Sequence, residues 1–160
     1  MKKDGFTLVE LLVVMAVLAL VLFIAVPKVN DTIVFAKRES FKNSAIELGK
    51  AAEKLVAISW NDITKPNVGE GSVISFFFIN KAGLVSNITG IADDSAVVAY
   101  NNSGTIEFYV FAMSSSNGYC VNGYRTTDIK DNVTVENHDY YTELLGNHTF
   151  SKVGNRLQVN

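Results

Sequence analysis

The stretch from Phe6 to Val26, FTLVELLVVMAVLALVLFIAV, decides how this chain folds and where it resides. Its only polar side chains are those of Thr7 and Glu10. A helix over these residues is about 30 Å long, which matches the hydrocarbon core of a membrane. A carboxylate in hydrocarbon costs about 3 kcal/mol or more unless it is paired. The stretch therefore predicts a helix able to span a membrane, in which Glu10 needs a partner.

Three simple interpretations of this apolar run do not account for all of its features. A cleaved secretory signal ends in small residues, whereas this run ends in the sequence FIAVP at 23–27. A plain membrane anchor explains Lys2 and Lys3 as a cytoplasmic flank but leaves Glu10 facing lipid. A buried core helix explains neither the length nor the uniform hydrophobicity.

A fourth interpretation gives Glu10 a partner. Cleavage between Gly5 and Phe6 would create a free ammonium group on Phe6, four residues before Glu10. The ammonium of a neighbouring copy would then pair with this carboxylate as the helices pack. Opposite charges about 4 Å apart attract by roughly 4 kcal/mol at an effective dielectric constant near 20. Glu10 is therefore predicted to set the register between helices, because any other stagger would leave its charge unpaired.

The residues GFTLVEL at 5–11, the apolar run after them and Pro27 resemble the class III signal of type IV pilins and pseudopilins. The resemblance implies that a prepilin peptidase cleaves after Gly5 and methylates the amino group of Phe6. It also implies the α+β pilin fold, in which a long kinked N-terminal helix packs on a small antiparallel sheet. The hydrophobic half of that helix would lie in the membrane or in the filament core.

By the same resemblance the chain is a structural subunit of a type IV pilus and not an enzyme. Its implied partners are further copies of itself, the prepilin peptidase, the pilus assembly platform and the cytoplasmic membrane, which the precursor spans once. The assembled protein would lie at the cell surface. A minor pilin, or a pseudopilin of a type II secretion or competence system, is an alternative with the same N-terminus. A monomeric membrane-anchored binding domain is an alternative of another class, and it would keep Lys2 and Lys3.

Pro27 ends the apolar run without ending the helical pattern. It leaves the carbonyl of Phe23 without its N–H donor, which predicts a kink, although a helix that starts at Pro27 is the alternative. Apolar or small residues then recur at steps of three or four residues, with one step of five, up to about Trp60, which predicts an amphipathic helix packed on a sheet. These residues are Val29, Ile33, Ala36, Phe41, Ala45, Leu48, Ala52, Leu55 and Ile58.

The remaining residues predict a small head with turns and short strands. The expected organisation is a leader at 1–5, an apolar helix at 6–27, an amphipathic half at 28–60 and a head at 61–160. Within the head, Ser72–Ser86 could be a short buried helix that ends at Gly83 or a strand, because adjacent apolar residues obscure the period. We interpret it as a helix, because residues 81–85 resemble a short helix and turn that many pilins place between the long helix and the sheet. A hairpin is expected at 96–100 and 105–111 around the turn 101–104, with further strands at 119–121, 133–135, 149–153 and 156–159.

The sequence offers no catalytic or cofactor motif. The net charge of −2, without blocks of like charge, does not indicate a nucleic-acid partner. Cys120 is the one cysteine, so no disulfide forms within the chain, and a small buried thiol is its simplest interpretation. No cofactor and no metal site are predicted, since the candidate ligands lack the spacing of known metal motifs. Those candidates are His138, His148, Asp139 and Glu143, with Asp128 and Asp131 for calcium.

Overall fold

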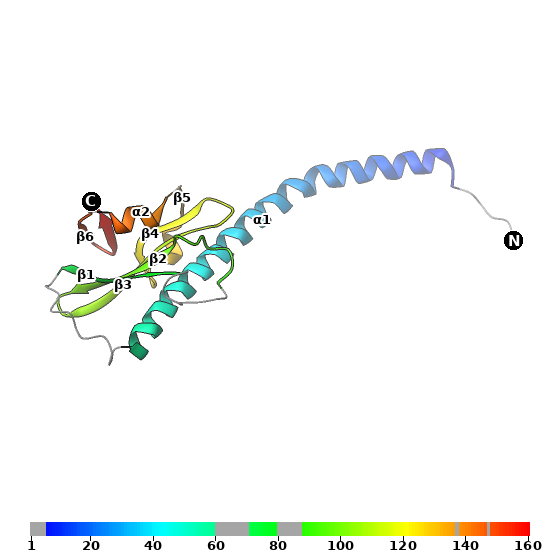
Figure 1. The fold of residues 1–160 in the computed structure, drawn as a ribbon. Coiled ribbons are helices and arrows are strands. Elements are labelled where there is room, and N and C mark those ends of the chain that lie inside the picture. Colours follow the sequence, from blue (N-terminus) through cyan, green and yellow to red (C-terminus); the bar gives the residue numbers. More distant parts are fainter. Residues whose placement is uncertain (1–5, 60–70, 80–87, 137, 147) are drawn as a thin grey trace. The chain divides into compact units, whose positions relative to one another are not determined.

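The computed structural model describes residues 6–59, 71–79, 88–136, 138–146 and 148–160 (Figure 1). The elements in chain order are α1 (Leu8–Ser59), β1 (Ser72–Phe78), β2 (Ala96–Asn102), β3 (Thr105–Met113), β4 (Tyr119–Arg125), the 3-10 helix η1 (Ile129–Asp131), β5 (Thr134–Val135), α2 (Tyr140–Leu145), β6 (Phe150–Val153) and β7 (Arg156–Val159). The strands pair antiparallel in the order β1-β2-β3-β4-β7-β6, and β5 pairs with β4. The α+β prediction, a long N-terminal helix with an antiparallel sheet, is confirmed.

Helix α1 contributes to two compact units, residues 1–37 and residues 38–160. It begins directly after Thr7 and contains Pro27 in its interior. The alternative of a helix start at Pro27 is therefore wrong. The flanking residues favour helix strongly enough to keep the surrounding turns intact around the one missing N–H group.

In the second unit, α1 buries one stripe against the sheet. Phe41, Ala45, Leu48 and Ala52 follow steps of four, three and four residues, so they share one face, and none is more than 4% exposed. The sheet residues that meet this stripe include Val97, Ala99, Val110, Ala112 and Val121. Full burial of a side chain such as Leu48 contributes about 1.5–3 kcal/mol to folding.

The ends of the predicted stripe do not take part in this core. Val29 and Ile33 belong to the first unit and are exposed, as is Ile58 near the end of α1. The apolar period alone therefore predicted a longer buried stripe than the one that packs on the sheet.

The opposite face of the sheet carries a second core. Tyr109 and Phe111 of β3 pack there with Tyr140 and Leu144 of α2 and with Leu157 of β7. All five side chains are at most 1% exposed. The central strands are therefore covered on both faces, which explains why they read as nearly continuous apolar runs.

The predicted hairpin is formed by β2 and β3. Asn102 pairs with Thr105, and the turn residues Ser103 and Gly104 both have positive φ, at 52° and 85°. Such a turn matches the twist of the two strands. The side-chain carbonyl of Asn101 accepts the N–H of Gly104 at 3.0 Å and fixes the turn.

The helix predicted over Ser72–Ser86 is wrong where the structure describes it. Residues 72–78 form strand β1, which pairs with β2, while residues 80–87 lie outside the described residues. Phe77 packs in the core on the α1 side, and Phe78 packs in the core on the opposite side. Because both faces of β1 contact a core, its side chains do not alternate between polar and apolar, and the strand period is hidden.

The shorter strands of the head agree with the prediction. Strand β4 includes the expected residues 119–121, and β5, β6 and β7 lie at the three expected places nearer the C-terminus. Strand β7 joins β4 through the pair Tyr124 and Arg156, and β6 forms the outer edge beside β7. The sheet thus places the C-terminal residues beside the middle of the chain.

Candidate functional site: the N-terminal helix

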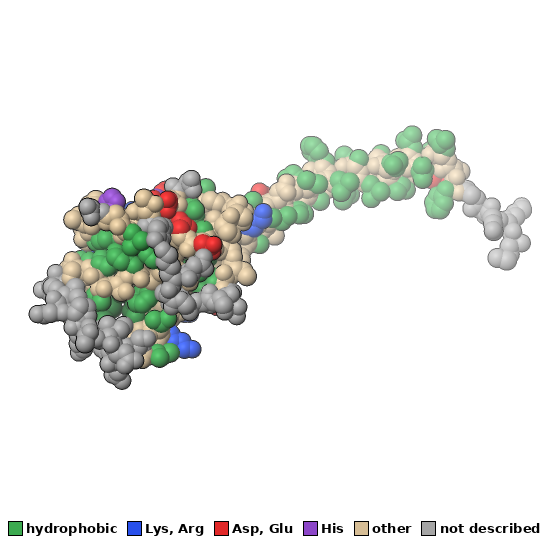
Figure 2. Space-filling model, in the orientation of Figure 1, with side chains coloured by type: hydrophobic (Ala, Val, Ile, Leu, Met, Phe, Trp, Pro, Cys, Tyr) green, Lys and Arg blue, Asp and Glu red, His purple; other side chains and the backbone are tan. Residues whose placement is uncertain are grey.

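The N-terminal part of α1 presents an apolar surface that no described residue covers. The described helix is long and apolar enough to span a membrane, and none of its most apolar window, with a mean hydropathy of 3.1, is buried. Figure 2 shows hydrophobic side chains over this part of the helix. An apolar surface of this kind marks contact with a membrane or with other protein chains.

Glu10 forms a reciprocal cap with Thr7 at the start of this helix. The backbone N–H of Thr7 donates to Glu10 Oε2 at 2.8 Å, and the Thr7 hydroxyl donates to the same oxygen at 2.7 Å. In return, the backbone N–H of Glu10 donates to Thr7 Oγ1 at 3.3 Å. This is a capping box, which satisfies N–H groups that the first turn of a helix leaves without partners.

The cap is a function of Glu10 that the sequence interpretation missed. The signal was present, because Thr7-Leu8-Val9-Glu10 has the spacing of a Thr and a Glu in a capping box before an apolar run. The cap places the carboxylate at the positive end of the helix dipole. It supplies hydrogen bonds without supplying a positive charge, so the predicted pairing with an ammonium group remains a separate prediction.

The other residues of the predicted signal are placed as follows. Gly5 lies outside the described residues. Phe6 precedes α1 and is 87% exposed, so the peptide bond before it adjoins an exposed residue. Pro27 lies within α1, and the kink predicted there stays a prediction.

The candidate metal ligands of the head mostly serve as structural hydrogen-bonding groups. Asp128 accepts from the Arg125 guanidinium at 3.0 Å, and Asp139 caps α2 by accepting from the backbone N–H of Thr142 at 3.2 Å. Asp131 is exposed in η1. These contacts give no oxygen cage of the kind that calcium prefers.

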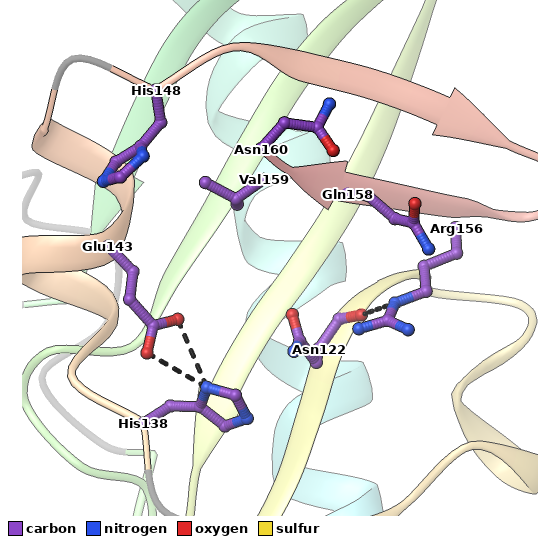
Figure 3. Close-up of a pocket in the computed structure, with 8 residues that line it drawn as sticks. All are labelled: Asn122, His138, Glu143, His148, Arg156, Gln158, Val159 and Asn160. Carbon is purple, nitrogen blue, oxygen red and sulfur yellow. Dashed lines mark hydrogen bonds and ion pairs between the residues drawn. The ribbon is translucent and has the colours of Figure 1, made fainter.

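His138 differs from the other candidates, because it lies between two carboxylates. Its Nδ1 is 3.0 Å and 3.2 Å from the two carboxylate oxygens of Glu143, and its Nε2 is 3.0 Å from Glu136. Figure 3 shows Glu143 on α2 pointing toward His138, and His148 drawn separately along the same pocket. The Cys120 thiol, a carboxylate oxygen of Glu136 and a ring nitrogen of His138 all lie within 4.8 Å of one another. The sequence did not predict this grouping.

Tyr140 closes the inner side of the His138 cluster. Its ring stacks on the His138 ring with centroids 5.0 Å apart and planes at 9°. Its hydroxyl donates to the carbonyl of Val121 at 3.1 Å, and burial strongly raises the pKa of the phenol. Tyr140 therefore stays neutral and positions the histidine ring.

The fold has a pilin-like α+β architecture, with a long N-terminal apolar helix and an antiparallel sheet. Residues 1–26 match the family model of the prokaryotic N-terminal methylation motif, the class III signal of type IV pilins. The match supports a precursor of the type IV pilin or pseudopilin kind and points to a structural subunit. No curated protein and no solved structure matches the chain significantly.

Proposed function

We propose that this chain is a structural subunit of a type IV pilus. The precursor crosses the cytoplasmic membrane once through residues 6–27, with residues 1–5 as a leader. A prepilin peptidase cuts after Gly5 and methylates Phe6. The assembly platform then moves the subunit from the membrane into a helical filament at the cell surface, in which the apolar helices pack together and residues 61–160 form the head.

One observation carries this proposal: a continuous exposed apolar surface holds a single carboxylate. Between Phe6 and Val26, Glu10 is the only charged side chain. A membrane or a filament core would both cover the apolar surface. The cap from Thr7 supplies hydrogen bonds but no positive charge, and no Lys or Arg lies between Phe6 and Val26. The cleaved terminus of Phe6, on a neighbouring copy, supplies that charge.

A plain membrane anchor has no comparable use for Glu10. In a lone helix the carboxylate would keep its cap but have no counter-charge. An unpaired carboxylate costs about 3 kcal/mol at the membrane centre, and less near the surface, where Glu10 would lie. In a bundle of processed helices, the same carboxylate would pair with the Phe6 ammonium of a neighbouring copy. This contact would favour one axial stagger between adjacent helices. The match to the methylation motif supports this choice, because the matched residues 1–26 include both Gly5 and Glu10.

The test is mass spectrometry of the N-terminal peptide from two fractions of the native cells. Filaments sheared from the surface are compared with the membrane fraction, and both are digested for the peptide that contains Glu10. We expect the sheared fraction to be rich in peptides that begin at N-methylated Phe6. Peptides that begin at Met1 or Lys2 and occur only in membranes would contradict the proposal and indicate an anchored domain.

Abundance separates the proposed major subunit from its close alternative. A major subunit makes up most of the protein in sheared filaments, whereas a minor pilin or pseudopilin with the same processed terminus is scarce there. Quantifying the processed peptide against total filament protein therefore tests the finer part of the proposal. A processed but scarce chain would favour the alternative.

A further inference from the structure

The pairing of β5 with β4 brings Cys120, Glu136 and His138 together. Cys120 pairs with Thr134, and the N–H of Glu136 donates to the carbonyl of Gly118 at 3.1 Å. The chain then reaches His138 two residues later, next to α2. Because β5 is held in this register, Cys120 meets Glu136 and His138 from a strand sixteen residues earlier, and the three side chains offer a sulfur, an oxygen and a nitrogen atom within 4.8 Å of one another.

The surroundings of His138 favour a cation beside its Nε2. A neutral imidazole has one N–H group and one lone pair, and both nitrogens of His138 face carboxylate oxygens. With Nδ1–H donating to Glu143, the Nε2 lone pair points at the Glu136 carboxylate 3.0 Å away. Two electron-rich atoms at this distance repel each other unless a proton or a metal cation lies between them. The cluster thus has the form of a metal site whose histidine is oriented through its other nitrogen.

We propose that Cys120 Sγ, a Glu136 oxygen and His138 Nε2 bind one Zn²⁺ ion, with water as the fourth ligand. Thiolate, imidazole and carboxylate are the ligands that zinc takes in proteins, whereas calcium and magnesium prefer oxygen alone. A thiolate and a carboxylate together balance the charge of the ion. Tetrahedral bonds of about 2.0–2.3 Å place ligand atoms roughly 3.3–3.8 Å apart, so the side chains need to rotate only slightly from their present separations.

Two further residues complete the site without touching the metal. With zinc on Nε2, the Nδ1–H of His138 would donate to Glu143, whose oxygens lie 3.0 Å and 3.2 Å from Nδ1, so Glu143 would fix the ring orientation as a positioning residue. The Thr134 hydroxyl lies 3.1 Å from Cys120 Sγ and donates to the thiolate when zinc is bound. The sulfur is buried while Glu136 is exposed, so the ion enters from the Glu136 side.

Zinc at this place would cross-link the C-terminal part of the head. Cys120 belongs to β4 in the middle of the sheet, whereas Glu136 and His138 lie on the segment that leads into α2. Helix α2 covers the second core through Tyr140 and Leu144. With one cysteine the chain forms no internal disulfide, and the metal would supply a cross-link in its place. Binding to the folded state alone would stabilise the head by mass action.

The experiment uses the full chain in detergent micelles, freed of metal with a chelator and then titrated with Zn²⁺ or Co²⁺. We expect one ion per chain by calorimetry, a higher unfolding temperature with zinc, and a sulfur-to-metal charge-transfer band with cobalt. The band needs no mutation and reports the thiolate directly. A wild-type protein that binds no zinc, or whose cobalt complex lacks the band, would overturn the proposal.

Single substitutions test which residues bind the Zn²⁺ ion. His138→Gln and Glu136→Gln alter side chains that are 16% and 55% exposed, and both are expected to abolish one-to-one binding of zinc. Glu143→Gln is expected to weaken it by about 10–100-fold, as for other residues that orient a ligand. His148→Gln is the matched control, because His148 lines the same pocket outside the cluster. Binding that survives His138→Gln, or that is lost equally in His148→Gln, would refute the site.

Discussion

Thr7 and Glu10 exchange hydrogen bonds across the first turn of α1. The Thr7 backbone and hydroxyl both donate to one Glu10 oxygen, and the Glu10 backbone donates back to the Thr7 hydroxyl. Glu10 therefore has a partner within its own chain before any assembly. Two roles for this carboxylate follow, a cap that depends on its hydrogen bonds and a register contact that depends on its charge.

Glu10→Gln separates the charge from the cap. The amide keeps an oxygen that accepts from Thr7 but has no charge to pair with the Phe6 ammonium of a neighbour. We expect cleavage after Gly5 to continue and filament yield to fall at least about tenfold, since each 1.4 kcal/mol of lost contact is tenfold. Filament yield is measured by shearing and immunoblotting, and cleavage by the mass of the membrane-bound chain.

Thr7→Ala is the matched control for Glu10→Gln. It removes the hydroxyl of the cap, at a cost of about 0.5–2 kcal/mol to the helix end, but keeps the Glu10 charge. We expect faster amide exchange in the first turn of α1 and nearly normal filaments. Normal filaments in Glu10→Gln together with failed assembly in Thr7→Ala would show that the cap matters and the charge does not.

Pro27→Ala tests the predicted kink. Alanine restores the N–H that the Phe23 carbonyl lacks and favours helix by about 3 kcal/mol over proline. We expect a longer and narrower distance distribution between spin labels at Val21 and Ile33, measured by electron paramagnetic resonance in micelles. Identical distributions in the variant and the parent would mean that Pro27 does not bend this helix.

Gly123→Ala should disrupt the contact between β4 and β7. Gly123 has a φ of 73°, and an added Cβ would overlap the carbonyl oxygen of Leu157 and approach the Phe111 ring. Backbone strain and crowding together should lower the free energy of unfolding by about 2–5 kcal/mol. Gly104→Ala is the control, because Gly104 has a φ of 85° but an added Cβ would meet no atom within 4 Å. This substitution should lower the free energy of unfolding by only about 1–2 kcal/mol. Equal losses in denaturant titrations would argue against the close contact.

Glu107 should make the stability of the head depend on acid pH. Burial would raise the pKa of Glu107, but hydrogen bonds from Lys152 at 2.7 Å and Tyr109 at 2.6 Å outweigh burial, and the pKa is lowered. A lowered folded-state pKa stabilises the protein above the unfolded value of about 4.3, and this stability is lost as the pH falls through the folded-state pKa.

Glu107→Gln should remove that part of the pH dependence. We expect a loss of about 1–3 kcal/mol at neutral pH, as is typical for hydrogen bonds to a charged group, and little loss at pH values below the folded-state pKa. Urea titrations followed by circular dichroism at several pH values measure the free energy of unfolding of the variant and the parent. Asp93→Asn, at an exposed loop position, is the control and should leave the profile unchanged. A profile that Glu107→Gln does not alter would contradict the role of Glu107.

The features that the sequence predicted correctly depend on local patterns. The apolar run after Phe6 and the turn before Thr105 each carry their own periodicity or turn residues, which act over a few neighbouring positions. The capping box of Thr7 and Glu10 was equally local and was readable in the same way.

The features that were missed depend on what covers each residue. Phe77 and Phe78 pack on opposite faces of β1, so the strand lacks the alternation that would have distinguished it from a helix. Likewise, no spacing rule relates Cys120 to Glu136 and His138. The pairing of β5 with β4 brings them together, and it is a contact between segments that are distant in the sequence.

The sequence by itself determined the N-terminal helix, its methylation motif and the hairpin, because each rests on residues close together along the chain, and the α+β class followed from the resemblance of that motif to the signal of pilins. Only the tertiary structure decided that β1 is a strand covered on both faces and that Cys120 lies beside Glu136 and His138. The physical reason is that burial on two faces and contacts across a sheet join residues whose separation along the chain carries no pattern.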